Sequence, residues 1–173
     1  MNVSPLLFMK QTLYFIPGLG EHCNLMRYRH LKKALQSRGY NVVCVNPNWY
    51  KPISEQIFRI EKNDIIIDFS FGAILAYLIA KKYPCRKIIL ASISPIHTFS
   101  YSSLVKDFHV HMPKDLAVEI TEDIKKIKIS LNSLKTHYIT LAGQLENVTA
   151  DFIIPNTGHR MTNTYIKRIQ KLV

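Results

Sequence analysis

The sequence predicts an α/β fold: a three-layer sandwich in which helices cover both faces of a mostly parallel sheet of five to six strands. Short apolar runs alternate with longer segments of helical periodicity along the 173 residues. The apolar runs are solid, as in DIIIDF, which indicates strands that are buried on both faces. Strands of this kind, separated by helices, form parallel sheets between helical layers.

The first half of the chain carries the clearest alternation. A strand is expected over 12–16, TLYFI, and the turn PGLG ends it. A helix is expected over 24–38, because apolar residues recur there at helical spacing and Gly39 follows as a C-terminal cap. The next expected elements are a strand over 40–46, a helix over 54–62 with Ser54 as its N-cap, a strand over 64–69, a helix over 71–83 and a strand over 87–94.

The pattern loosens after the fourth strand. Residues 96–115 mix aromatic, histidine and serine side chains without a clear period, and a helix is expected over 116–132. Together these stretches, 96–132, are expected to form a small cover region. The alternation then returns with strands over 137–143 and 151–155 and a closing helix over 163–173. We therefore expect one domain over 1–173, with little or no lid.

Composition favours a soluble globular protein. Hydrophobic residues make up 47% and charged residues 20% of the chain, which argues against disorder. The longest apolar run, AILAYLIA, is far shorter than the roughly 20 residues that a membrane span needs. The N-terminal segment has neither the basic start nor the cleavage site of a signal peptide, so a cytoplasmic protein is expected.

The three cysteines, Cys23, Cys44 and Cys85, are odd in number and have no CxxC spacing. Cys44 lies in the apolar run NVVCVN, where a buried reduced thiol is expected. This pattern argues against a disulfide framework or a zinc site and favours a reducing compartment.

The net charge of +11 comes from 23 Lys and Arg residues against 12 Asp and Glu residues. The basic residues are scattered, which is typical of solvated helix faces, although a basic surface can also attract an anionic partner. No nucleic-acid-binding signature accompanies them, so nucleic acid is not an expected partner.

Ser70 lies at a sharp corner between a buried strand and a buried helix, in the frame D-F-S-F-G. A nucleophile elbow, G-x-S-x-G, needs small residues two positions before and after the serine, because strand and helix approach closely there. Gly72 fits this pattern, whereas Asp68 replaces the first glycine by a larger, charged residue. The alternative is a plain tight turn built from small residues.

Two further residues follow strands at the same expected edge of the sheet. His159 lies in NTGHRM after the last strand, and histidine is the residue type whose near-neutral pKa range suits a general base. Glu146, three residues past Gly143, is a carboxylate that could orient this imidazole. Taken singly, each is more often an ordinary surface residue; Asp107 is a second candidate for the acid.

The loop FIPGLGEH follows the first strand. Its backbone N–H groups could stabilise an oxyanion, with Leu19 and Phe71 as the expected donors. The competing interpretation is a dinucleotide fingerprint, but Cys23 stands where the third glycine is needed and Asn46 where an acid is expected.

These pieces, in the order oxyanion loop, serine, acid and histidine, resemble the α/β-hydrolase fold family over nearly the whole chain. The resemblance implies Ser70 as nucleophile, Glu146 as acid and His159 as base, with the backbone N–H groups of Leu19 and Phe71 as oxyanion donors. It also implies that no cofactor is required.

The chain departs from the family in three places. Asp68 is expected to crowd the elbow and to add negative charge. Only the residues 144–150 separate the fifth and sixth strands, so the last strand is expected to be short, displaced or absent. The cover region is small, which predicts an open site.

The sequence thus predicts a serine esterase or thioesterase that acts on a small acyl substrate. If the basic surface is functional, an anionic substrate would fit it. A catalytically inactive, α/β-hydrolase-like binding protein is the alternative. Metal binding is not expected, since His109 and His111 have no carboxylate at matching spacing. Oligomeric state is left open. The residues expected to bind substrate are Gly18, Gly20, His22, Ile96 and His97.

Overall fold

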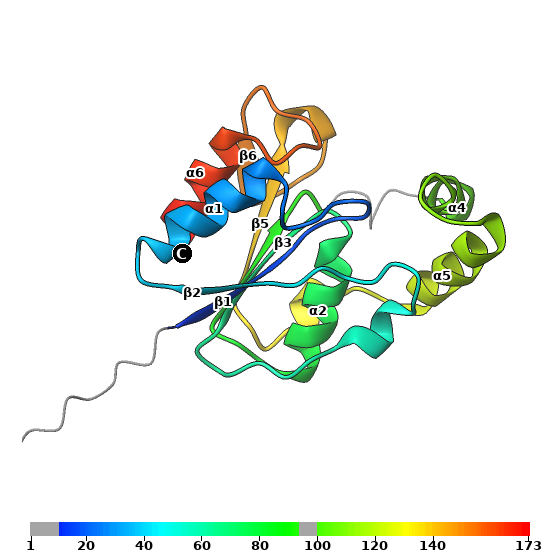
Figure 1. The fold of residues 1–173 in the computed structure, drawn as a ribbon, viewed down its shortest axis with the longest axis horizontal. Coiled ribbons are helices and arrows are strands. Elements are labelled where there is room, and N and C mark those ends of the chain that lie inside the picture. The colour runs from blue at the N-terminus through cyan, green and yellow to red at the C-terminus, as the bar shows by residue number, and fades with distance from the viewer. Residues whose placement is uncertain (1–10, 94–99) are drawn as a thin grey trace, which may run out of the picture.

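A computed structural model describes residues 11–93 and 100–173. Six strands form one sheet in the order β2-β1-β3-β4-β5-β6, and every neighbouring pair is parallel (Figure 1). This arrangement confirms the predicted parallel sheet of five to six strands. The strands are β1 (Thr12–Ile16), β2 (Asn41–Cys44), β3 (Ile65–Phe69), β4 (Lys87–Ala91), β5 (Tyr138–Gly143) and β6 (Phe152–Ile154).

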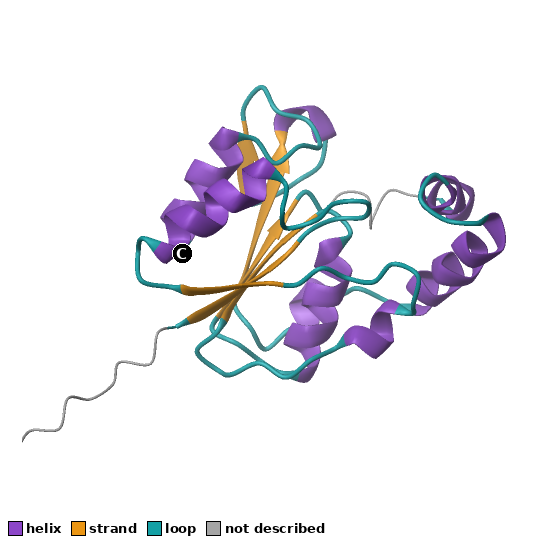
Figure 2. Cartoon of the chain, viewed as in Figure 1, coloured by secondary structure: helices purple, strands orange, loops and turns teal. Residues whose placement is uncertain are grey.

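Helices cover both faces of the sheet, as predicted (Figure 2). The helices α1 (Met26–Gln36) and α6 (Asn163–Leu172) lie side by side on one face, over a core that includes Leu13, Ile67 and Phe69. The helix α2 (Gly72–Lys82) lies on the other face, over Ile16, Ile66 and Leu90. Within the described residues, no helix is long and apolar enough to span a membrane.

The order of the strands fixes where a ligand site can form. The chain runs from β1 to its neighbour β2 and then returns to place β3 on the opposite side of β1. Helices therefore leave β1 and β3 toward opposite faces, which opens a crevice at the carboxyl ends of these two strands. The loop after β1 and the turn after β3 meet at this crevice, and they hold the predicted oxyanion loop and Ser70.

The predicted helix over 54–62 is wrong. The structure has one turn of 3₁₀ helix, η1 (Ile53–Gln56), and residues 57–61 are not helical. The Gln56 side-chain amide donates to the carbonyl oxygen of Asn48 and accepts from its N–H, and it thereby closes the preceding turn. Beyond it, Ile60 is buried, and the Phe58 ring packs 5.1 Å from that of Tyr14. Packing against the core therefore overrides the helical spacing.

The cover region is more helical than the sequence predicted. Helix α4 (Tyr101–His109) lies within the stretch expected to lack a period. Ser100 caps it by accepting a hydrogen bond from the Ser103 N–H, and Leu104 and Phe108, four residues apart, are buried. Helix α5 (Lys114–Lys126) starts two residues earlier than expected. It also ends earlier, because Ile127 and the residues after it leave the helix and pack against the core.

The last strand exists but is short, as the sequence analysis allowed. Strand β6 has three residues and pairs in parallel with Leu141–Gly143 of β5. The connection includes the 3₁₀ turn η3 (Gln144–Glu146), after which the chain returns along β5. There the Asp151 carboxylate accepts hydrogen bonds from the backbone and the hydroxyl of Thr140, both at 2.8 Å. This short return places Glu146 and the loop after β6 next to each other.

Candidate active site

Ser70 has the strained backbone that a nucleophile elbow requires. Its φ angle is +55°, in the left-handed region that serine rarely adopts. The Ser70 N–H continues the ladder of the sheet by donating to the Ala91 carbonyl at 2.8 Å. Two residues later, a Cβ on Gly72 would lie 2.5 Å from the Ile16 carbonyl oxygen, so only glycine fits where strand and helix meet.

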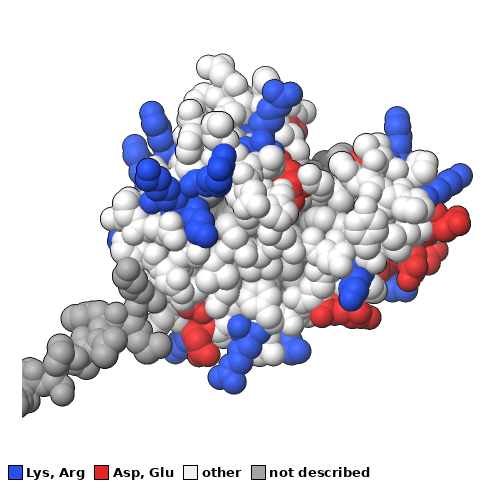
Figure 3. Space-filling view, viewed as in Figure 1, with Lys and Arg blue, Asp and Glu red and all other residues white. Residues whose placement is uncertain are grey.

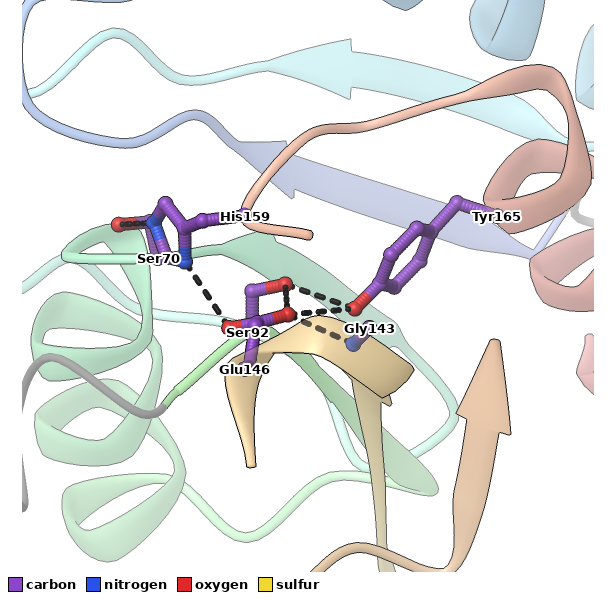
Figure 4. Close-up of polar contacts among 6 residues, drawn as sticks. All are labelled: Ser70, Ser92, Gly143, Glu146, His159 and Tyr165. Carbon is purple, nitrogen blue, oxygen red and sulfur yellow. Dashed lines mark hydrogen bonds and ion pairs between the residues drawn. The ribbon is translucent and has the colours of Figure 1, made fainter. Parts of the chain in front are cut away.

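The hydroxyl of Ser70 is the first member of a chain of hydrogen bonds (Figure 4). Its Oγ lies 2.7 Å from His159 Nε2, and His159 Nδ1 lies 2.9 Å from Glu146 Oε2. Because a carboxylate can only accept, Nδ1 carries the proton and donates it to Glu146. Nε2 is then left as the acceptor for the Ser70 hydroxyl. The structure thus brings together these three residues from three separate loops.

Three donors hold the other oxygen of Glu146. Oε1 accepts from the Gly143 N–H at 2.6 Å, the Ser92 hydroxyl at 2.7 Å and the Tyr165 hydroxyl at 3.2 Å. The Glu146 side chain is only 4% exposed, whereas that of His159 is 39% exposed. A buried carboxylate needs such donors to offset its lost hydration. The Glu146 carboxylate is therefore held in place by buried donors, whereas the His159 imidazole is partly exposed to solvent.

Ser92 and Tyr165 also contact each other, with 2.7 Å between their hydroxyl oxygens. Burial raises the pKa of Tyr165, and the Glu146 carboxylate raises it further, although the hydrogen bond with Ser92 opposes this. The phenol therefore stays protonated and can donate. Ser92 itself has a φ of +54°, a second strained serine at the end of the neighbouring strand β4.

The loop that carries His159 is docked closely onto η3. The Leu145 N–H donates to the Thr157 carbonyl at 2.9 Å. A Cβ on Gly143 would lie 2.5 Å from the Gly158 carbonyl oxygen and closer still to that of Thr157, so this approach requires glycine. The His159 ring packs against Phe69, with 5.3 Å between centroids. These contacts limit where the imidazole can lie.

Asp68 behaves differently from the sequence-based expectation of added negative charge. Its side chain is fully buried on β3, and neither carboxyl oxygen has a hydrogen-bond partner in the described part of the chain. Burial raises the pKa of Asp68 well above its ordinary value, and the backbone of Ala91 opposes this only in part. The carboxyl group is therefore held toward its neutral form.

The expected oxyanion loop lies directly against the serine. A Cβ on Gly18 would be 3.0 Å from Ser70 Cβ, so the two backbones are in close contact. Leu19 follows in the same loop and packs against the core, and Phe71 is the N-cap residue of α2. Glu21 braces the loop, because its carboxylate binds both the Arg27 guanidinium and the Tyr28 hydroxyl.

The residues expected to bind substrate divide into three groups. Gly18 adjoins Ser70, and Gly20 lies against the His111 imidazole from the cover region, where a Cβ would come within 2.5 Å of the ring. His22 is exposed, and its Nδ1 accepts from the Asn24 N–H of its own loop. Ile96 and His97 lie outside the described residues.

The two other histidines considered for a metal do not share a strand face. His109 ends α4, and its Nδ1 contacts the Met112 carbonyl oxygen at 3.2 Å. Among the described residues, no group of three His, Cys, Asp or Glu side chains could hold a metal ion. Asp107 lies on α4, and the acid that contacts His159 is Glu146.

Sequence reasoning missed the residues that hold the acid. Ser92 directly follows β4, whereas the sequence analysis extended this strand to residue 94 and so placed the loop two residues too late. Tyr165 lies in the predicted closing helix at an apolar position, and its spacing in the sequence does not indicate a hydrogen bond to Glu146. One signal was available: Ser92 follows the carboxyl end of a buried strand, as Ser70 does, and this position indicates a side chain at the same edge of the sheet.

No family model and no curated protein matches the sequence. The fold is similar to that of an α/β-hydrolase enzyme from a sediment metagenome of the Mar Chica lagoon in Morocco, at 15% identity, a TM-score of 0.63, and coverage of 94% of this chain and 88% of the other. An esterase from Pyrococcus furiosus matches at 15% identity and a TM-score of 0.60, covering 94% and 80%. Mouse α/β-hydrolase domain-containing protein 10 matches at 14% identity and a TM-score of 0.57, covering 93% and 87%. The chain has the α/β-hydrolase fold.

Proposed function

We propose that this protein is a serine hydrolase that cleaves esters or thioesters, with Ser70 as nucleophile, His159 as base and Glu146 as the acid that orients it. One observation supports the proposal above all. An unbroken series of hydrogen bonds runs from the strained Ser70 through His159 to a buried carboxylate. An elbow, a base in hydrogen-bond reach and an oriented tautomer are the parts that acyl transfer needs.

In the proposed reaction, Ser70 Oγ attacks the substrate carbonyl while His159 Nε2 takes the hydroxyl proton. The tetrahedral intermediate collapses as His159 returns that proton to the leaving group, which leaves an acyl group on Ser70. Water, activated by the same imidazole, then releases the acid. Glu146 keeps its charge throughout and stabilises the imidazolium that forms twice in the cycle.

The backbone N–H groups of Leu19 and Phe71 are the proposed donors to the oxyanion. The contact of Gly18 with Ser70 supports this assignment, because it brings the loop after β1 to the nucleophile. A neutral Asp68 is compatible with an oxyanion nearby, whereas a charged carboxylate would oppose it. The raised pKa of Asp68 thus weakens the main argument for an inactive binding protein.

The proposed substrate is a small acyl ester or thioester. The net charge of +11 favours an anionic one. The chemistry requires no cofactor, since each proton and charge is handled by the chain's own groups.

The test is labelling with a fluorophosphonate probe, which reacts only with activated serines. The wild type should label, and Ser70→Ala and His159→Ala should not. His30→Ala, an exposed histidine on α1, is the matched control and should label like the wild type. A screen of short esters and thioesters then follows. If the folded wild type stays unlabelled, the hydrolase proposal fails and a ligand-binding function takes its place.

A further inference from the structure

Two cysteines share a pocket on the opposite side of β1 from Ser70. Cys23 lies in the loop between β1 and α1, and Cys44 ends β2 at the edge of the sheet. Both line a pocket of about 290 Å³. Its charged residues are all basic and come from α1: Arg29, Lys32 and Lys33. Figure 3 shows Lys and Arg side chains gathered over the side of the molecule where α1 and α6 lie.

The backbone holds the two thiols near one another. Cys44 is the register partner of Phe15 in the β1–β2 pair. Cys23 Sγ lies 4.0 Å from the Phe15 carbonyl oxygen, which also accepts a hydrogen bond from the Val45 N–H at 2.9 Å. The Cys23 N–H donates to Asn46 Oδ1 at 2.9 Å, which fixes this part of the loop to the end of β2. Both sulfur atoms thus lie around Phe15, on the face that α1 covers.

The two thiols have unequal acidities. A hydrogen bond from Cys23 lowers the pKa of Cys44 to about 7, and Lys32 contributes, while partial burial opposes both. The same contact raises the pKa of Cys23, and burial raises it further. Cys44 is half-buried rather than buried as the sequence predicted, so the pocket gives reagents access to its sulfur. One sulfur is thus a nucleophile near neutral pH, and its neighbour keeps its proton.

We propose that Cys44 and Cys23 form a redox-active pair that hydroperoxides oxidise to a disulfide. The first step is attack of the Cys44 thiolate on the peroxide ROOH. An S–O bond forms, the O–O bond breaks, and the alkoxide leaves as ROH after taking a proton. The Cys23 sulfur then attacks the Cys44 sulfenic acid, so that the S–S bond forms and the S–O bond breaks. The hydroxide leaves with the Cys23 proton as water.

The balance is two thiols and one hydroperoxide to one disulfide, one alcohol and one water, with two electrons passing to the peroxide. Cys23 is suited to the second step. Its high pKa arises first from the hydrogen bond with Cys44, and this cause disappears once Cys44 is a neutral sulfenic acid. The pair needs nothing from Ser70 or His159, so the inference does not depend on the proposed hydrolase activity.

Cys85 provides an internal control. It is also a free thiol, but it is buried, its Sγ contacts the Lys87 carbonyl oxygen at 3.5 Å, and burial raises its pKa. It should stay unreactive while the protein is folded. A reagent that reaches only unfolded molecules would modify Cys85 as readily as Cys44, so the ratio of the two separates site reactivity from unfolding.

The experiment treats the reduced, folded protein with one equivalent of hydrogen peroxide and maps the thiols by mass spectrometry. The expected product is about 2 Da lighter, carries one Cys23–Cys44 disulfide and returns to the starting mass with dithiothreitol. Cys23→Ser should stop at a sulfenic acid on Cys44 that dimedone traps. Cys44→Ser should not react, and Cys85→Ser should behave like the wild type.

A second readout tests the basic pocket. Alkylation of Cys44 by iodoacetamide at neutral pH should slow several-fold in Lys32→Gln, because a cation that favours the thiolate is lost. Lys33→Gln removes a pocket lysine that does not affect this pKa, so it should change the rate little. The proposal is overturned if the treated wild type keeps three free thiols, if the disulfide joins another pair, or if Cys44 alkylates no faster than Cys85.

Discussion

Replacing Asp68 by asparagine should stabilise the protein, and the gain should grow as pH rises. Asp68 is fully buried, neither of its carboxyl oxygens has a hydrogen-bond partner among the described residues, and its pKa is raised. In the unfolded chain the carboxyl ionises above about pH 4, whereas in the native state it keeps its proton to a higher pH. Unfolding therefore releases a proton, and raising the pH favours unfolding. Asparagine has nearly the same shape and no proton to lose.

The size of the effect follows from linkage. For each pH unit between the ordinary and the raised pKa, the free energy of unfolding of the wild type falls by about 1.4 kcal/mol relative to that of the variant. Every two pH units over which only the unfolded carboxyl is ionised change the difference in free energy of unfolding by about 3 kcal/mol. That is a large share of the roughly 5–15 kcal/mol that holds a typical domain together. The difference should level off where the native carboxyl ionises.

The assay is urea unfolding of the wild type and Asp68→Asn at several values between about pH 5 and pH 8, because groups common to both cancel in the difference. Asp151→Asn is the control. Hydrogen bonds from Thr140 lower the pKa of Asp151, so its folded and unfolded forms are both ionised across this range and the difference should stay constant. A flat profile for Asp68→Asn as well would refute the buried neutral carboxyl.

Three further predictions concern the geometry of the site. Ser92→Ala and Tyr165→Phe should each slow labelling by a fluorophosphonate about ten-fold without unfolding the protein, because Glu146 loses a donor worth about 1.5 kcal/mol or more. Gly143→Ala should abolish labelling, since its Cβ meets two backbone oxygens, whereas Gly158→Ala, whose Cβ has its nearest neighbour at 3.8 Å, should label normally. Gly72→Ala should lower the free energy of unfolding by about 1–3 kcal/mol in urea titrations, because its Cβ would overlap rigid backbone.

The parts of the fold that were predictable are those in which local pattern and burial agree. Strand β3 is apolar except for Asp68, and helix α2 is apolar up to the two lysines at its end, so the burial of both elements follows from sequence. The residues 54–62 were assigned wrongly to a helix, because apolar spacing of three and four also suits a bent, extended segment when its side chains reach the core. Helix α4 was missed because only two of its residues, Leu104 and Phe108, are buried, and two positions are too few to show a helical period in the sequence.

The candidate site was predictable where chain order carries information. A serine, an acid and a histidine that each follow a different strand of a parallel sheet lie at the same edge of that sheet, and Ser70, Glu146 and His159 meet there. The partners of Glu146 were not predictable, because Ser92 and Tyr165 contact it only once β4, β5 and α6 are packed. The ionisation of Asp68 was misjudged for a related reason, since burial decides it and sequence does not report burial.

Backbone strain is an independent argument that this edge of the sheet is the functional one. Among the described residues, four that are not glycine have a positive φ: Ser70, Ser92, Asn147 and Asn156. Each lies beside the proposed machinery: the nucleophile, a donor to the acid, the residue after Glu146, and a residue three positions before His159. Such conformations cost free energy, more for serine than for asparagine, and persist only where the surrounding structure enforces them. Packing alone would scatter them among the turns of the fold, whereas a site that must aim a hydroxyl, a carboxylate and an imidazole at one another needs them together.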